Sequence, residues 1–107
     1  MEHWDLRQMP MDVHRPAVLQ SDGEGRAIAL SLPAGERLQE HQVHERAWVM
    51  VAAGEVEIEQ DGSSESGGPG LVAHFEPKQR HEVRAKTDTR LLLFLAPWPG
   101  EGHPSQR

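Results

Sequence analysis

The sequence predicts an all-β fold: a single-domain jelly-roll β-barrel or sandwich of about eight or more short antiparallel strands. Three observations support this fold class. Ten glycines and eight prolines recur along the 107 residues and leave almost no room for a long helix. The segments between them are short, and they alternate or run apolar as half-buried or sandwiched strands do. A chain of this length has room for one small domain only.

The clearest expected strand covers residues 55–60, where Val56 and Ile58 occupy one face and glutamates the other. It ends at Asp61-Gly62, a dipeptide typical of a two-residue hairpin turn. Residues 62–70 are rich in glycine and serine, and we expect them to form a flexible loop. The other expected strands cover residues 13–19, 26–32, 47–52, 71–75, 80–85 and 90–95.

The composition also predicts the organisation and the partners of the chain. We expect an N-terminal arm over residues 1–12, a barrel domain over 13–96 and a flexible tail over 97–107. The net charge is -6 and the 11 basic residues are scattered, which argues against nucleic-acid binding. No targeting segment is visible, and the longest apolar run, 91–96, is too short to span a bilayer. We therefore expect a cytoplasmic protein that does not bind a membrane.

The absence of cysteine excludes disulfides, thiolate catalysis and iron–sulfur ligation. Imidazole and carboxylate are then the strong metal ligands that remain, and the chain has seven histidines. His3 and His103 lie in the terminal segments, and His14 precedes an Arg-Pro pair. We interpret these three as solvated surface residues.

His41, His44 and His81 are the candidate metal ligands. The first two lie where the chain enters an apolar strand, and His81 lies in a second strand, so a β scaffold could bring them together around a divalent ion. His41 and His44 face opposite sides of a regular strand and reach one ion only if the strand is bulged or irregular near Gln42. Glu45 or water could add a further ligand. The alternative is that His81 is a core histidine and the other two line a wet rim.

The glycines around these histidines resemble the two motifs of the cupins, a family of small jelly-roll proteins. Five residues separate Gly35 from His41, and Gly54 closes the first motif. Gly70 and His81 are eleven positions apart, as in the second motif. The resemblance covers residues 35–85, and it implies a barrel whose interior holds Fe, Mn, Ni or Zn.

The chain departs from the cupin pattern inside both motifs. The second histidine position of the family falls on Val43, and Ala47 occupies the position of its glutamate. In the second motif, Ala85 stands where the family has asparagine. Without the carboxylate, the resemblance implies a more positive three-histidine site that favours an anionic or bidentate oxygen ligand.

Two functional hypotheses follow from these residues. The first is a metal-binding cupin-like protein with a small-molecule pocket inside the barrel, acting as a metal-dependent oxygenase or isomerase. The alternative is a non-catalytic binding or sensing module that lacks a functional metal centre. The candidate general bases, none of which has a spacing that demands the role, are Glu45, His74 and Glu82. The expected pocket residues are Val49, Val51 and Val83, with Phe75 or Phe94.

Residues 47–52 are apolar on both faces of the expected strand, which predicts burial on both faces. In a single barrel the outward face, with Trp48 and Met50, would form an exposed patch. We therefore expect a homodimer in which a second subunit covers it. The alternative is that the N-terminal segment covers this patch, in its own chain or by exchange, through Trp4, Leu6 and Met9.

Overall fold

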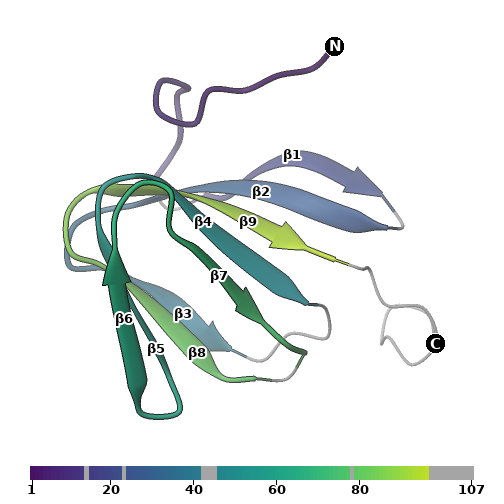
Figure 1. Cartoon of the computed structure of the whole chain (residues 1–107). Coiled ribbons are helices and arrows are strands. Elements are labelled where there is room, and N and C mark those ends of the chain that lie inside the picture. The colour runs from purple at the N-terminus through teal and green to yellow at the C-terminus, as the bar shows by residue number, and fades with distance from the viewer. Residues whose placement is uncertain (14, 23, 42–45, 78, 97–107) are drawn as a thin grey trace.

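Two antiparallel sheets lie face to face in the computed structural model, which describes residues 1–13, 15–22, 24–41, 46–77 and 79–96, without the side chains of 39–41 (Figure 1). The large sheet has the order β1-β2-β9-β4-β7, with β1 at Ala17–Asp22, β2 at Gly25–Leu32, β9 at Thr89–Leu95, β4 at Ala47–Ala53 and β7 at Val72–Phe75. The small sheet has the order β3-β8-β5-β6, with β3 at Arg37–His41, β8 at His81–Ala85, β5 at Val56–Gln60 and β6 at Ser63–Gly67. This architecture confirms the predicted all-β jelly-roll class.

The chain crosses from one sheet to the other at both ends of the sandwich. The connections β2–β3, β4–β5, β6–β7 and β8–β9 gather at one end, on the left in Figure 1. At the other end β3 leads to β4 and β7 leads to β8. We call this second end the site end, because β3 finishes there at His41 and β8 begins there at His81.

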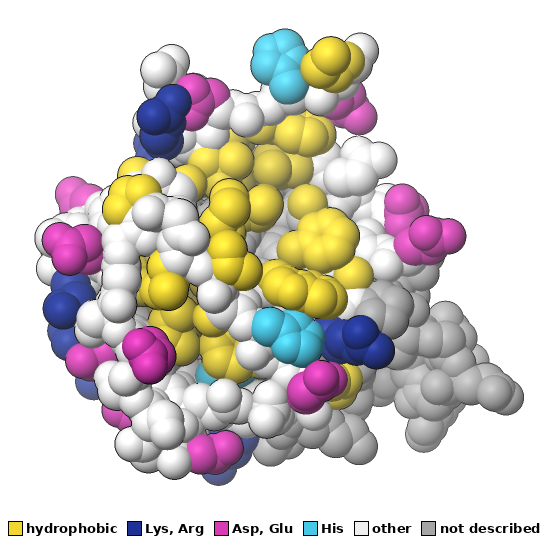
Figure 2. Space-filling view, viewed as in Figure 1, with side chains coloured by type: hydrophobic (Ala, Val, Ile, Leu, Met, Phe, Trp, Pro, Cys, Tyr) yellow, Lys and Arg dark blue, Asp and Glu magenta, His cyan; other side chains and the backbone are white. Residues whose placement is uncertain are grey.

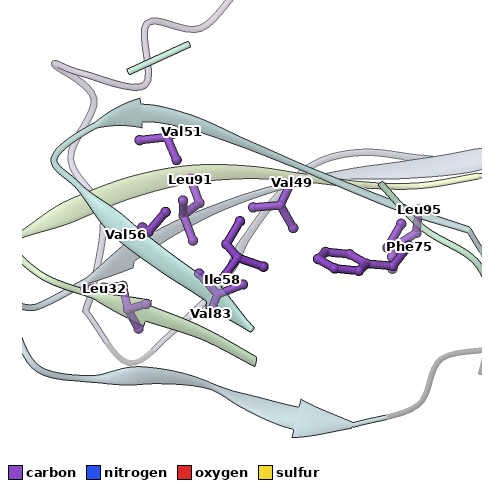
Figure 3. Packing of buried hydrophobic residues seen from close by; sticks show 11 residues of the cluster. Leu32, Val49, Val51, Val56, Ile58, Phe75, Val83, Leu91 and Leu95 are labelled. Carbon is purple, nitrogen blue, oxygen red and sulfur yellow. The ribbon is translucent and has the colours of Figure 1, made fainter. Parts of the chain in front are cut away.

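The core lies between the inner faces of the two sheets, where side chains from both sheets interdigitate (Figure 3). Each strand contributes alternate residues, because successive side chains of a strand point to opposite faces. The buried apolar residues are Leu32, Ala47, Val49, Val51, Phe75, Leu91 and Leu95 from the large sheet and Val56, Ile58, Val83 and Ala85 from the small sheet.

The β5–β6 hairpin contains one confirmed prediction and one wrong one. Asp61 and Gly62 have φ values of 50° and 81°, as the tight two-residue turn between Gln60 and Ser63 requires. The expected loop over 62–70 was wrong, because β6 occupies part of it. The turn sets the register of β6 against β5, so the backbone ladder forms although serine and glycine give the segment no apolar pattern.

The outer faces of the two sheets differ in chemistry. The small sheet carries ion pairs between neighbouring strands, with Arg37 to Glu82 at 3.3 Å and Arg84 to Glu57 at 3.2 Å. These pairs are at least partly exposed, so each contributes little to stability. The ion pairs indicate that the outer face of the small sheet is solvated.

The N-terminal segment is attached to the large sheet through Arg90 of β9. The Arg90 guanidinium donates to the backbone carbonyls of Leu6, at 2.8 Å, and Met9. Within the segment, hydrogen bonds from Arg7 lower the pKa of Asp5.

The boundary of the arm at residue 12 stays a prediction. The expected tail at 97–107, which contains His103, lies outside the described residues, and so does His14. No helix suited to crossing a membrane occurs in the part of the chain that is described.

Gly54, in the turn between β4 and β5, has a φ of 85°, and a Cβ there would collide with the Asp88 carbonyl oxygen and lie 2.6 Å from Thr89 Oγ1. We predict that Gly54→Ala lowers the free energy of unfolding by about 3 kcal/mol or more, because backbone strain and steric overlap add. Urea denaturation followed by tryptophan fluorescence measures the loss.

Gly35 provides the matched control, since it has the same φ of 85° but a Cβ there would meet nothing within 4 Å beyond its chain neighbours. Gly35→Ala should cost only about 1 kcal/mol, the backbone part alone. Equal losses in the two variants would contradict the packing described for Gly54.

Candidate functional site

His81 opens β8 at the site end and points into the space between the sheets. Only 6% of its surface is exposed, and the strand alternates as expected, with Val83 and Ala85 also buried and Glu82 and Arg84 on the other face. A histidine on this inner face is surrounded by apolar side chains, so its ring orientation depends on a few specific contacts.

Phe75 and Gln79 contact the His81 ring. The Phe75 ring stacks on it, with the ring centroids 3.8 Å apart and an interplanar angle of 5°. The Nδ1 atom lies 3.3 Å from the Gln79 carbonyl oxygen. A carbonyl only accepts hydrogen bonds, so Nδ1 is the protonated nitrogen in this contact. This is an arrangement that metal-binding histidines commonly adopt.

The backbone of β3 brings His41 opposite His81. Leu38 pairs with Val83 and His41 with His81, so β3 advances three residues while β8 advances two. The shift marks a β-bulge between Leu38 and His41, earlier in the chain than the irregularity expected near Gln42. The histidines at 41 and 81 are thus cross-strand neighbours in the ladder.

The third predicted ligand, His44, lies outside the described residues, as does Glu45, and the side chain of His41 is not described. Among the residues that are described, no three or more histidine, aspartate or glutamate side chains form a metal-binding group. The set of His41, His44 and His81 therefore stays a prediction.

Several candidates for the pocket or for general base catalysis lie elsewhere. Glu82 is on the outer face of the small sheet, paired with Arg37. His74 lies on the outer face of the large sheet, where its ring centroid is 4.6 Å from that of Trp48. Phe94 is on the same outer face and is 41% exposed, so it does not line the interior. Strand parity accounts for all three positions.

The interior of the barrel is more closely packed than we expected. Val49, Val51 and Val83 are buried in the core cluster and do not face open space (Figure 3). A pocket of about 210 Å³ opens instead between β2, β3 and the residues Asp12, Val13, Arg15 and Pro16. The sequence did not indicate this pocket, because it depends on how the arm and β3 meet. Its lining includes Arg15, Leu30, Leu32, Arg37, Leu38 and Leu91.

The sequence profile of the cupin domain matches residues 29–97, and the chain therefore belongs to the cupin domain family. No curated protein matches the chain. The matched segment contains β3 to β9 and the second half of β2, and β1 precedes it.

Solved structures share the fold. An RmlC-like cupin protein from Desulfovibrio desulfuricans has a TM-score of 0.79 at 23% identity, over 91% of this chain and 97% of that chain. The Cnp3 cupin domain of Schizosaccharomyces pombe has a TM-score of 0.76 at 15% identity, over 89% and 73%. A cupin superfamily protein from Desulfitobacterium hafniense has a TM-score of 0.74 at 16% identity, over 82% and 83%. At these identities the similarity is one of fold.

Proposed function

We propose that this chain is a cupin that binds a metal ion and a small molecule, and that His41, His44 and His81 hold the ion. The observation that supports the proposal most strongly is the pairing of His41 with His81 across the β3–β8 ladder. Directly opposite residues of an antiparallel pair share one face of the sheet. The bulge in β3 therefore favours a shared role for the two histidines.

The donor chemistry at His81 fits a divalent ion such as Fe, Mn, Ni or Zn. The Gln79 carbonyl fixes Nδ1, which favours Nε2 as the ligand atom, and the stacked Phe75 ring limits water at this histidine. A divalent ion bound there would supply Lewis-acid or dioxygen chemistry to a bound small molecule. We propose an oxygenase or an isomerase as the reaction class.

A non-catalytic binding or sensing module is the second candidate, and Ala47 favours it. This residue occupies the position at which the cupin pattern has glutamate, and it is fully buried at the site end beside Phe75 and Leu95. A methyl group cannot bind a metal, so an ion here would have fewer protein ligands and bind less tightly. The cytoplasmic location and the absence of nucleic-acid partners stay predictions.

We predict that untagged protein loaded with zinc retains one ion per chain after dialysis, and that His81→Ala reduces this to background. The reason is that a site with two imidazoles holds the ion much more weakly than a site with three. Elemental analysis of the dialysed protein measures the ratio.

His3→Ala is the control, because His3 lies exposed in the N-terminal segment. His41→Ala and His44→Ala should resemble His81→Ala while retaining the β-sheet circular dichroism spectrum. The metal site would be refuted if the parent protein retained no zinc, or if the folded His81→Ala variant retained all of it. The non-catalytic binding or sensing module would then be the remaining candidate function.

We also propose that the chain forms a homodimer through the outer face of the large sheet. Trp48 pairs in register with Phe94 and with His74, and Met50 pairs with Leu92 and with Val72, so these side chains share one face. Figure 2 views this side of the molecule and shows a broad hydrophobic area with few charged side chains within it. The charged outer face of the small sheet has the opposite character.

A second copy is a better occupant of this face than the chain's own N-terminal segment. The segment is held at the Arg90 end of the sheet and leaves Val72 56% exposed and Phe94 41% exposed. A continuous apolar face of this kind on a small domain is typical of a subunit interface. A two-fold dimer would bury the same patch on both chains.

We predict that Phe94→Glu converts the dimer to a monomer, because it would bury an unpaired charge in each half of the interface. Light scattering at micromolar concentration measures the mass. Lys86→Glu, at an exposed position after β8, changes the charge without touching this face and should remain dimeric. A parent protein that is monomeric under these conditions would exclude the dimer.

A further inference from the structure

The two sheets leave a lateral opening at one side. The large sheet ends at β7 and the small sheet ends at β6, and these two edge strands are not paired with each other in the described residues. A pocket of about 280 Å³ lies between them. In Figure 1, β6 and β7 lie at the front of the molecule and diverge from the connection that joins them, and Figure 2 shows hydrophobic side chains beside the pale serine and glycine strip of β6. We call this pocket the lateral slot.

The wall of the lateral slot is mainly apolar. Ile58, Leu71, Ala73 and Phe75 line it, and all four belong to the core cluster or pack against it. Phe75 also stacks on His81, which is not among the slot residues. The Phe75 ring thus separates the slot from His81, and a flat apolar ligand in the slot would contact this ring.

Gln60 is a shielded polar group in this mainly apolar wall, and the other polar residues that line the slot are Ser63, Glu65 and His74. Gln60 follows Ile58 by two positions on β5, which places it on the same inner face, and it lines the slot. Its Nε2 atom is shielded from solvent and has no hydrogen-bond partner among the described residues. A buried amide donor without an acceptor destabilises the protein, so a ligand that supplies an acceptor at this point gains affinity.

The negative charge at the slot determines which hydrogen-bond acceptor a ligand can carry. Glu65 lines the same slot from β6, and a carboxylate on the ligand would be repelled by it. A neutral carbonyl oxygen accepts the Gln60 hydrogen bond without this repulsion. The apolar wall, the aromatic ring of Phe75 and the shielded, unpartnered Gln60 donor together fit a small molecule with one ring and one carbonyl.

We propose that the lateral slot binds small uncharged aromatic ketones or aldehydes, with the carbonyl oxygen on Gln60 Nε2 and the ring against Phe75. This rests on the small-molecule binding of the proposed function and does not depend on the metal ligands.

Acetophenone and ethylbenzene are matched probes, because they differ in the carbonyl group alone. Titrated into the ¹⁵N-labelled full chain, acetophenone should cause saturable NMR shifts at β5, β6 and β7, and ethylbenzene should bind more weakly. Gln60→Leu should weaken acetophenone binding about five-fold, the effect of one neutral hydrogen bond, and leave ethylbenzene unchanged. Gln20→Leu, at an exposed position of β1, is the control.

Ala73→Leu provides an independent test, since a larger side chain would fill the slot and should abolish binding of both probes. Absence of saturable shifts in the parent, shifts away from β5–β7, or unchanged binding in the folded Ala73→Leu variant would overturn the proposal. An equal loss of both probes in Gln60→Leu would overturn the role of the amide. A His81→Ala variant that loses zinc but retains acetophenone separates failure of the metal site from failure of the slot.

Discussion

The contact between the inner faces of the two sheets is the interaction on which the rest of the molecule depends. Val49 and Leu91 of the large sheet meet Ile58 and Val83 of the small sheet with almost no exposed surface. Burial of this apolar area is the main stabilising contribution in a domain of 107 residues. It also determines the parity of every strand, because a shift of one residue would exchange the inner and outer faces.

That parity produces both the proposed site and the proposed interface. In β8 it brings His81 inside together with Val83, while the charged residues between them stay outside. In β4 the same alternation leaves Trp48 on an outer face that is apolar, in contrast to the ion-paired face of the small sheet. The bulge in β3 is the local exception, and it brings His41 into register with His81.

Much of the fold could be predicted from the sequence, because alternation in strands such as β4, β5 and β8 and the Asp61-Gly62 turn are direct consequences of side-chain chemistry. The strand β6 could not be predicted from the sequence, because its register is set by the turn and not by its own serines and glycines. The bulge before His41 was not predicted, because a bulge is a backbone feature without a distinctive residue, and the irregularity expected near Gln42 lies outside the described residues. Gln60 was missed because a lone glutamine at a strand end is usually solvated, and only the pocket between the edge strands β6 and β7 distinguishes it.

The central claim is that His81 presents Nε2 to a metal ion inside a cupin barrel. Long-range ¹H–¹⁵N NMR of the histidine rings, recorded before and after the addition of zinc, tests it directly. We expect the metal-free ring of His81 to carry a proton on Nδ1, with its Nε2 resonance moving as zinc is added. Protonation on Nε2, or zinc shifts confined to exposed histidines such as His3 and His74, would contradict the claim.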